Sequence, residues 1–222
     1  MISRRINIFT GHFGSGKTEV SVNFALNLSE TSDNVAIVDF DIVNPYFRTA
    51  DAKDIMEEKG IKVLLPMYAN TNVDVPAIPA EVNTLFENKS YRVILDVGGD
   101  DLGAKVLSRY RDEILSDDFY MYFVINTNRP MTDSVLKIEE MIYSIEESAR
   151  IKVSGLVNNT NLLHFTTSED VMNGHEMILE VSKKLGIPIA FSTCLGTDSK
   201  EIETRTGTSV LSMTKNIKLP WQ

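Results

Sequence analysis

The sequence predicts an α/β fold in which helices pack on both faces of a parallel β-sheet. Seven short apolar runs recur along the 222 residues, and most of them are continuous rather than alternating. Continuous runs are typical of strands that are buried on both faces of a parallel sheet. Helical patterns lie between the runs, and this alternation favours a single doubly wound domain over residues 1–222. Hydrophobic residues make up 43% of the chain, which is enough for a full core.

The expected strands are the apolar runs themselves. In chain order they are INIF at 6–9, VAIV at 35–38, KVLL at 62–65, RVILD at 92–96, YMYFVI at 120–125, VSGLV at 153–157 and IPIAF at 187–191. Three helices stand out between them, because apolar residues repeat there at intervals of three and four. They cover 19–29, a segment that starts from Thr132, and a segment that starts at Ser168 and ends at Gly186.

Composition restricts the partners and the compartment. The formal net charge of -9 opposes non-specific binding to nucleic acid or anionic lipid, so no nucleic-acid partner is expected. Cys194 is the only cysteine, and a lone thiol forms neither an internal disulfide nor a metal cluster within one chain. No stretch approaches the roughly 18 apolar residues of a membrane span. The first residues resemble a strand rather than a signal peptide, and we therefore expect a cytoplasmic protein.

The segment GHFGSGKT matches the phosphate-loop pattern G-x-x-x-x-G-K-[ST] completely. Its glycines allow the backbone to wrap around phosphate oxygens with the amides pointing inward. The following helix adds free N–H groups and the positive end of its dipole. Lys17 is expected to reach the β- and γ-phosphates, and the Thr18 hydroxyl to bind Mg²⁺. The alternative is a glycine-rich turn that binds nothing. The predicted nucleotide contacts are Gly11, His12, Phe13, Gly14, Ser15, Gly16, Lys17 and Thr18.

Two further strands end in carboxylates. Asp96 ends RVILD and is followed by two glycines, Gly98 and Gly99, which makes it a candidate for the acid that holds Mg²⁺ through water. Asp39 ends a second strand, and Asp41 follows two residues later. Because the strands belong to one parallel sheet, the acids are expected to converge at its carboxyl edge. Asp41 could orient a water on the γ-phosphate. The alternatives are a helix cap for Asp96 and a turn acid for Asp41.

These segments resemble the MinD/ParA/nitrogenase-iron-protein group of P-loop ATPases. This is the deviant Walker or SIMIBI family, also described as the CobQ/CobB/MinD/ParA nucleotide-binding domain. GHFGSGKTEVSVNFALNLS is similar to the family's loop and first helix, VAIVDFDIVNPYFRTAD to its switch I segment, and VILDVGGDD to its Walker B and switch II segment. The resemblance covers nearly the whole chain in order. It implies a mostly parallel sheet of seven or eight strands and an ATP-dependent dimeric switch.

The resemblance also implies roles for single residues. Asp39 and Asp96 would share the magnesium shell with the phosphate-loop threonine. Asp41 would position the attacking water and Gly99 would sense the γ-phosphate. Asp100 would be a switch acid, so that the implied catalytic groups are Asp41, Asp100 and the phosphate-loop lysine.

Adenine is the expected base. GTP-reading P-loop proteins use an Asn-Lys-x-Asp run, and the place of the Asp is taken here by Asn161, whose amide has one acceptor oxygen and a competing donor. VSGLVNN resembles the family strand whose terminal Asn reads adenine, and that role falls on Asn158. An amide can pair with the adenine amino group and a ring nitrogen, although a strand-end turn is an alternative role for Asn158. The expected cofactors are ATP and Mg²⁺.

One position departs from the family's loop. The typical form K-G-G-x-G-K-[ST] begins with a signature lysine that reaches into the partner's site, whereas this chain has His12 there, followed by Phe13. A neutral imidazole supplies no fixed cation. Either hydrolysis is slow or another cation helps, and Arg48 is the nearest candidate. The related dethiobiotin synthetase and cobyrinate amidase-like enzymes also lack this lysine.

The preferred function is a slow Mg-dependent ATPase that acts as a nucleotide-dependent homodimeric switch on an unknown partner protein. The alternatives are an ATP-dependent biosynthetic enzyme of the dethiobiotin synthetase or cobyrinate amidase type, and a regulatory module that barely hydrolyses ATP. The segment 66–81 is the only obvious supplier of polar groups from outside the phosphate loop, and its few charges favour the switch. The short tail contains Pro220, which disfavours membrane anchoring.

Overall fold

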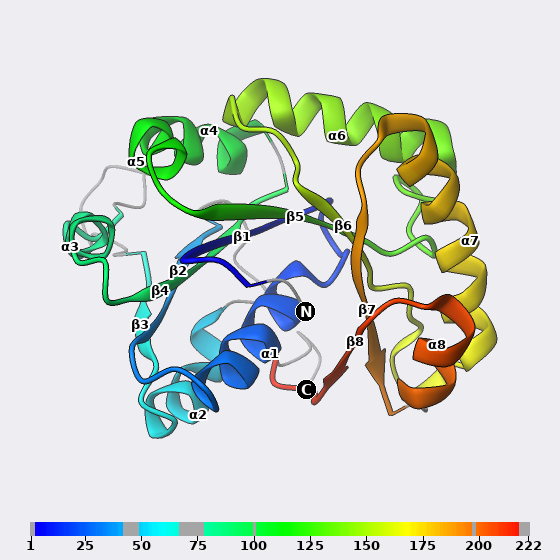
Figure 1. Cartoon of the computed structure of the whole chain (residues 1–222), viewed down its shortest axis with the longest axis horizontal. Helices are drawn as coiled ribbons and strands as arrows, with labels where there is room; N and C mark the ends of the chain where they lie inside the picture. The colour runs from blue at the N-terminus through cyan, green and yellow to red at the C-terminus, as the bar shows by residue number, and fades with distance from the viewer. Residues whose placement is uncertain (1–2, 42–48, 67–77, 100, 197–198, 218–222) are drawn as a thin grey trace, which may run out of the picture.

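The computed structural model describes residues 3–41, 49–66, 78–99, 101–196 and 199–217. Eight strands within these residues form one sheet in the order β3-β2-β4-β1-β5-β6-β7-β8, and every neighbouring pair is parallel (Figure 1). The predicted α/β class, with a mostly parallel sheet of seven or eight strands, is thereby confirmed. The strands are β1 (Ile6–Thr10), β2 (Val35–Phe40), β3 (Lys62–Leu64), β4 (Arg92–Val97), β5 (Phe119–Ile125), β6 (Gly155–Asn158), β7 (Ile189–Leu195) and β8 (Val210–Met213).

The first seven strands coincide with the seven apolar runs, but β8 was not anticipated. It is a four-residue edge strand in which Leu211 and Met213 are buried while Ser212 is exposed. Such a strand has no continuous apolar run, so the pattern typical of a central parallel strand does not reveal it. The segment that the sequence presents as a tail therefore begins inside the sheet.

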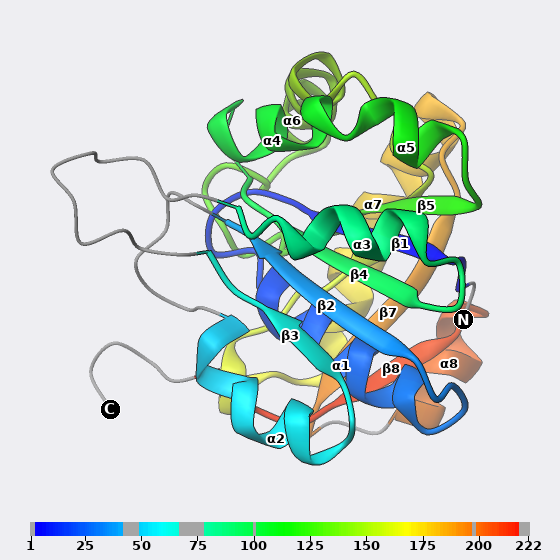
Figure 2. The ribbon, with the colours of Figure 1, turned by 90° about the vertical axis from the view of Figure 1, so that its left-hand side faces the viewer.

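Helices cover both faces of the sheet (Figure 2). On one face, α1 (Lys17–Ser29) and α2 (Lys53–Glu58) pack in a common apolar cluster with β1, β2 and β5. A short 3-10 turn, Thr49–Ala52, leads into α2. The opposite face carries α3 (Glu81–Glu87), α4 (Asp101–Arg109), α5 (Arg111–Leu115), α6 (Val135–Ala149) and α7 (Ser168–Leu185). The last helix, α8 (Ser199–Thr206), packs beside α7, β7 and β8.

The ends of the two longest helices follow from side-chain caps. α6 begins at Val135, three residues after the predicted start, because the Ser134 hydroxyl caps the backbone N–H of Lys137. α7 begins at Ser168 as predicted, behind a capping box in which the side chains of Thr167 and Asp170 each bond the other's backbone. Gly186, with a φ of 69°, ends α7 in the left-handed conformation that glycine favours.

An aromatic cluster fixes α1 on the sheet. Phe24 of α1 meets Phe9 of β1 edge-on with ring centroids 5.0 Å apart, and Phe9 stacks on Tyr122 of β5 at 4.7 Å. Pairs of this geometry contribute about 0.5–1.5 kcal/mol each beyond the area that they bury. Because α1 starts directly after the glycine-rich loop, the same packing sets the position of that loop.

The parallel register brings the ends of three strands together at one edge. β1 lies between β4 and β5, with Phe9 opposite Asp96 and Thr10 opposite Phe123. Asp39 of β2 is the direct neighbour of Asp96 on β4. The two strand-end acids therefore meet beside the glycine-rich loop that follows β1.

Candidate functional site

The loop from Gly11 to Gly16 joins β1 to α1 and depends on two close backbone approaches. Gly16 has a φ of 83°, and a Cβ there would lie 2.4 Å from the side-chain nitrogen of Asn159. Gly99, after β4, approaches so closely that its Cβ would lie 1.8 Å from the Gly11 carbonyl oxygen. Only glycine fits at these places. The segment after β4 is thus set directly against the loop.

Asn159, which follows β6, holds the loop from the other side. Its Nδ2 donates to the Ser15 carbonyl oxygen at 2.6 Å, and its Oδ1 accepts from the Thr193 hydroxyl of β7 at 2.6 Å. All three residues are buried, and a buried amide bonded at both ends fixes its neighbours strongly. The sequence drew attention to the run NNTN, but no signal in it distinguished Asn159 as the anchor of the loop.

Lys17 and Asp41 form a buried ion pair at the carboxyl edge. Lys17 Nζ lies 2.5 Å from Asp41 Oδ2, and the two side chains are only 6% and 11% exposed. The Asp41 backbone N–H donates to Asp39 Oδ1 at 2.9 Å, and the Thr49 hydroxyl donates to Asp96 Oδ2 at 3.1 Å. Lys17 therefore faces three carboxylates in a place that excludes most water.

Burial and crowding change the acidity of these groups. Burial, together with the neighbouring Asp96, raises the pKa of Asp39. Burial also raises the pKa of Asp96, against the opposing effect of Lys17. Burial alone would lower the pKa of Lys17, but the surrounding carboxylates outweigh it and the net shift is upward. The carboxylates thus exceed the positive charge beside them, and a further cation would relieve their repulsion.

The surroundings of Asp96 have the kind of oxygen donors that Mg²⁺ prefers. Asp96 Oδ1 is buried without a hydrogen-bond partner in the described part of the chain, while its Oδ2 accepts from Thr49. The Thr18 hydroxyl lies beside Asp96 and acts to lower its pKa. His, Cys, Asp and Glu side chains of the described residues form no ready set of three metal ligands. Mg²⁺ commonly binds one or two carboxylates and keeps water and phosphate as its other ligands, so Asp96, Thr18 and the adjacent Asp39 suit it.

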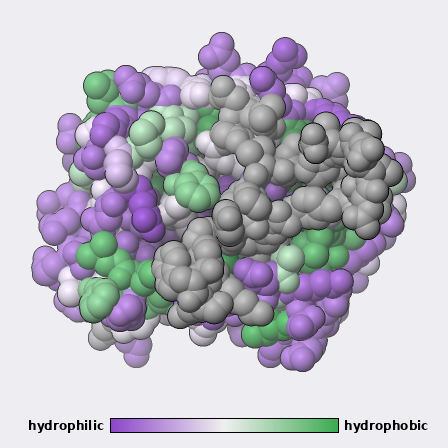
Figure 3. Space-filling model, turned by 180° about the vertical axis from the view of Figure 1, so that it is seen from behind, coloured by the Kyte–Doolittle hydropathy of each residue, from purple (hydrophilic) through white to green (hydrophobic). Residues whose placement is uncertain are grey.

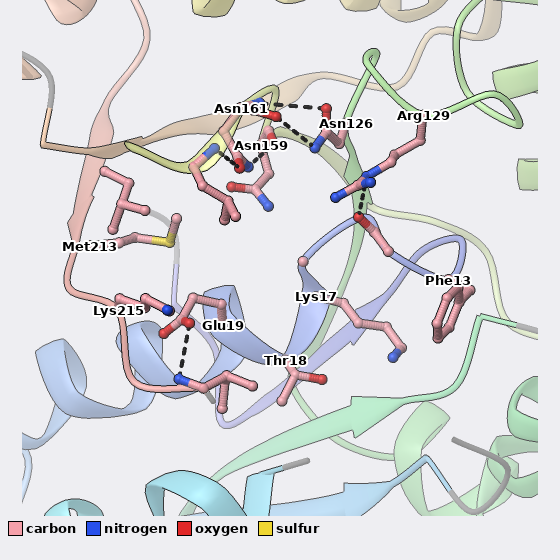
Figure 4. Close-up of a pocket in the computed structure, with 15 residues that line it drawn as sticks. Phe13, Lys17, Thr18, Glu19, Asn126, Arg129, Asn159, Asn161, Met213 and Lys215 are labelled. Atoms are coloured by element: carbon pink, nitrogen blue, oxygen red, sulfur yellow. Dashed lines mark hydrogen bonds between the residues drawn. The ribbon is translucent and has the colours of Figure 1, made fainter. Parts of the chain in front are cut away.

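A cavity of about 350 Å³ opens beside the loop (Figure 4). Gly14, Gly16, Lys17 and Thr18 line it on the side of the loop, and amide side chains gather across from them. Its volume lies in the range of pockets that enclose small-molecule ligands. The remaining wall is largely apolar, as the flat face of a base requires. The amides are Asn126, Asn159 and Asn161, and the apolar wall contains Leu163, Leu195, Met213 and Ile217.

Arg129 reaches the loop from the turn after β5, and sequence reasoning missed it. Its Nε donates to the Gly14 carbonyl oxygen at 3.0 Å. Figure 4 shows its side chain beside the loop at the rim of the cavity, which it helps to line. Arg129 is remote from the loop in sequence and belongs to no motif, so only the pairing of β1 with β5 brings it there.

Asn158, the predicted adenine contact, lies in the core beside α7. Its side chain is fully buried, donates to the Val171 carbonyl oxygen at 2.9 Å and accepts from the Thr160 N–H at 3.1 Å. Asn158 is not among the described residues that line the cavity, because its amide serves the packing of β6 against α7. Asn161 does line it, and its Oδ1 accepts from the Leu163 N–H at 3.2 Å.

The other predicted groups are placed as follows. His12 Nδ1 lies 2.8 Å from the Phe13 carbonyl oxygen, to which it donates, so the imidazole is bonded within its own loop. Asp100 and Arg48 lie outside the described residues, as does 67–77 of the segment 66–81. Their predicted roles stay predictions.

The chain has an α/β fold like that of solved P-loop NTPases, as the motifs predicted. FtsY from Mycoplasma mycoides superposes with a TM-score of 0.52 at 19% identity, covering 87% of this chain and 61% of its own. FtsY from Thermotoga maritima gives 0.50 at 21% identity, covering 85% and 60%. The chain thus spans about three fifths of these FtsY chains. A ParA family ATPase from Chlorobium tepidum gives 0.47 at 18% identity, covering 93% and 91%.

No protein-family model matches the sequence, and no curated protein matches it either. Among the helices that the structure describes, none has both the length and the apolar run needed to cross a lipid bilayer.

Proposed function

We propose that the chain binds ATP with Mg²⁺ at residues 11–18, hydrolyses it slowly and acts as a nucleotide-controlled homodimeric switch on a partner protein. The observation that carries the proposal is the buried pair of Lys17 and Asp41, which lies beside Asp39 and Asp96 behind a phosphate loop. Buried charges of this kind are a poor source of stability, because desolvation offsets their attraction. A bound magnesium triphosphate would give these charged groups a function, since Lys17 can bind its phosphates and the carboxylates can bind its metal ion and water.

Phosphate binding follows from the loop and from Lys17. The N–H groups at the start of α1 and the helix dipole attract an anion. Lys17 remains protonated in the neutral range because its pKa is raised. A γ-phosphate competes with Asp41 for Lys17, and this exchange lets Asp41 orient the attacking water. Gly99, in contact with Gly11, supports a γ-phosphate sensor at the end of β4.

Mg²⁺ would be held by Thr18, Asp96 and Asp39, and it supplies charge neutralisation at the β- and γ-phosphates. Asp96 Oδ1 supports this assignment, since it is buried without a protein partner in the described part of the chain. Thr49 fixes the other oxygen of Asp96 and thereby orients the carboxylate.

The cavity supports adenine as the base. Asn161 lies in its wall, and its Oδ1 is already an acceptor for Leu163. A guanine would need a carboxylate with two acceptor oxygens at this position, and an amide offers a donor instead. Asn126 and Asn161 are closer to the cavity than Asn158 and take over the role of base contacts in our proposal.

Exposed apolar side chains at the same edge support a second copy of the chain as partner. Phe13 of the loop is 54% exposed, and Leu162 and Phe165, after β6, are 47% and 72% exposed. One face of the molecule shows hydrophobic patches among hydrophilic residues (Figure 3). Exposed aromatic residues are enriched at protein interfaces. Arg129 supplies a cation to each loop from within its own chain, which compensates in part for His12.

Calorimetry on Lys17→Ala tests nucleotide binding. Removal of the cation should weaken ATP binding by about 100-fold, which corresponds to about 2.7 kcal/mol. Lys183→Ala is a matched control, since it removes the same charge from the exposed far end of α7. An ATP affinity that stays within about threefold of the wild type in Lys17→Ala would overturn the proposal.

Turnover measured at increasing protein concentration tests the switch. A rate per molecule that rises with concentration supports a homodimer in which hydrolysis depends on association. A rate per molecule that does not change with concentration favours the second candidate, an ATP-dependent biosynthetic enzyme. The observation that supports this candidate is His12, which stands in place of the signature lysine. Chelation of Mg²⁺ should abolish turnover in both cases.

A further inference from the structure

The segment Thr214–Ile217, directly after β8, packs against the first turns of α1. Met213, Lys215 and Ile217 line the same cavity as the phosphate loop. Figure 4 shows Met213 and Lys215 at the side of the cavity away from Arg129. Ile217 is 5% exposed and belongs to the apolar cluster under α1. This segment therefore forms one wall of the candidate nucleotide site.

Glu19 holds this wall through backbone hydrogen bonds. Its Oε1 accepts from the Asn216 N–H at 2.8 Å, and its Oε2 accepts from the Ile217 N–H at 3.1 Å. Oε1 also accepts from the side-chain amides of Asn216 and Asn23, at 3.2 and 3.1 Å. Hydrogen bonds to a charged acceptor are about twice as strong as neutral ones. The carboxylate thus clamps two consecutive backbone amides of the segment.

Asn23, one helical turn further along α1, supplies a second clamp. Its Nδ2 donates to the Thr214 carbonyl oxygen at 2.9 Å, and its Oδ1 accepts from the Thr214 N–H at 2.9 Å. The two side chains of α1 together bind backbone groups of Thr214, Asn216 and Ile217. The wall is therefore attached to the helix that begins at the phosphate loop.

The position of Glu19 is electrostatically awkward for a site that binds phosphate. It follows Lys17 and Thr18 directly, and a carboxylate in the first turn repels an anionic ligand at the helix start. Burial, which is the main cause, raises its pKa, and the hydrogen bonds from residues 216 and 217 oppose that rise. The unfavourable position of the Glu19 carboxylate is offset by the four N–H groups that donate to it.

We propose that Glu19 is a positioning residue for the nucleoside end of the site. It holds Met213, Lys215 and Ile217 where they contact the base or ribose of a bound nucleotide. The proposal rests on nucleotide binding at residues 11–18, as stated above. It implies reciprocal coupling: a nucleotide stabilises the clamped segment, whereas a ligand with phosphates alone does not.

Calorimetry with ADP and with inorganic pyrophosphate separates the two ends of the site. Glu19→Gln keeps the shape but replaces one acceptor oxygen by a donor that faces a backbone N–H. We expect ADP affinity to fall about tenfold, or about 1.4 kcal/mol, while pyrophosphate affinity stays within about twofold. Glu30→Gln, which removes the same charge at the far end of α1, should leave both affinities unchanged.

Each other outcome has a defined meaning. An unchanged ADP affinity in Glu19→Gln would overturn the inference and leave nucleotide binding intact. An equal loss for ADP and pyrophosphate would overturn it too, because Glu19 would then act at the phosphate end. A wild-type chain that binds neither ligand would refute the proposed function itself.

Hydrogen exchange on the wild type keeps the inference testable if Glu19→Gln does not fold. The amides of Asn216 and Ile217 should exchange about tenfold more slowly with saturating ADP than with saturating pyrophosphate. Equal protection by the two ligands would overturn the inference without any variant.

Discussion

At the scale of single residues, Asp41 is the group whose substitution separates binding from chemistry. Its carboxylate neutralises Lys17, and in the proposed reaction it orients water. Asp41→Asn keeps the shape and removes the charge. We expect single-turnover hydrolysis to slow by about 100-fold while the Kd for MgATP stays within about threefold.

The matched control for this substitution is Asp54→Asn, which removes the same charge from an exposed position of α2. If affinity and turnover fall equally in Asp41→Asn, Asp41 belongs to the magnesium shell rather than to the water.

Arg129 tests whether a cation from outside the loop serves the phosphates. Arg129→Gln should weaken ATP and inorganic pyrophosphate alike, by about fivefold, because its contact with Gly14 lies at the phosphate end of the cavity. Calorimetry with both ligands measures the effect, and Arg111→Gln on α5 is the control. If both affinities are unchanged, Arg129 only supports the loop through Gly14 and does not bind phosphate.

At the scale of elements, the sequence predicts best what a local pattern encodes. Continuous apolar runs predict β1 to β7, because most of these strands are buried on both faces. Helical periodicity predicts α1 and α7, because one side of each helix is buried. β8 and the shorter helices did not emerge, because a short edge strand and helices of a few turns leave no strong period. The phosphate loop was readable because its residues are contiguous.

The site residues that were missed are brought together only by the fold. Arg129, Asn159 and Asn216 reach the loop or its helix from the ends of other strands, and no local pattern reports the distance between two strand ends. The predicted adenine contact by Asn158 stays a prediction. The sequence could not tell that its amide bonds Val171 and Thr160 in the core, whereas Asn126, Asn159 and Asn161 line the cavity.

The start of β5 is joined to β1 by a charge cluster around the buried Asp117, and this cluster controls stability in acid. Asp117 Oδ2 accepts from Arg5 Nε at 2.7 Å and from Lys89 Nζ at 2.5 Å, and its side chain is 8% exposed. Burial alone would raise the pKa of Asp117, but the hydrogen bonds from Arg5 and Lys89 hold it well below the usual range. The folded-state pKa is thus depressed, so the stabilisation exists above the unfolded pKa and is lost as the pH falls through the folded value.

We therefore expect Asp117→Asn to lower the free energy of unfolding by about 2–3 kcal/mol at pH 7. The extra stability of the wild type should disappear as the pH falls from about 4, the pKa of an unfolded Asp, through the lower pKa of Asp117 in the folded state. The two proteins should therefore be equally stable in strong acid. Urea denaturation across this pH range measures it. Asp118→Asn, at a more exposed neighbour, is the control, and parallel pH curves for Asp117→Asn and the wild type would contradict the prediction.

At the scale of the whole molecule, His12 decides whether two copies catalyse together. The imidazole is bonded to its own loop through Phe13, next to an exposed aromatic ring. If two copies meet across their sites, His12→Lys places a fixed cation where negative charge develops. We expect turnover to rise about tenfold, equal to about 1.4 kcal/mol of transition-state stabilisation. The gain should appear only at protein concentrations that support association.

Steady-state ATP hydrolysis at several protein concentrations is the measurement, and the control is Thr31→Lys, which adds the same charge at an exposed position beyond the far end of α1. No gain in His12→Lys, together with turnover that ignores concentration, would rule out the dimeric mechanism and favour the biosynthetic enzyme.

The central position of β1 has a consequence for the nascent chain. β1 is the first of the eight described strands in chain order, and it pairs on both edges with strands that come much later, Ile6 beside Val93 on one side and beside Phe119 on the other. During translation one edge of β1 therefore stays open until β4 has been made, and the other stays open until β5 has followed. Pairings this distant in sequence form slowly and leave apolar strands exposed meanwhile. A fragment that ends before β5 carries the entire glycine-rich motif but lacks Arg129 and Asn159, which bond the loop from the turn after β5 and from the end of β6.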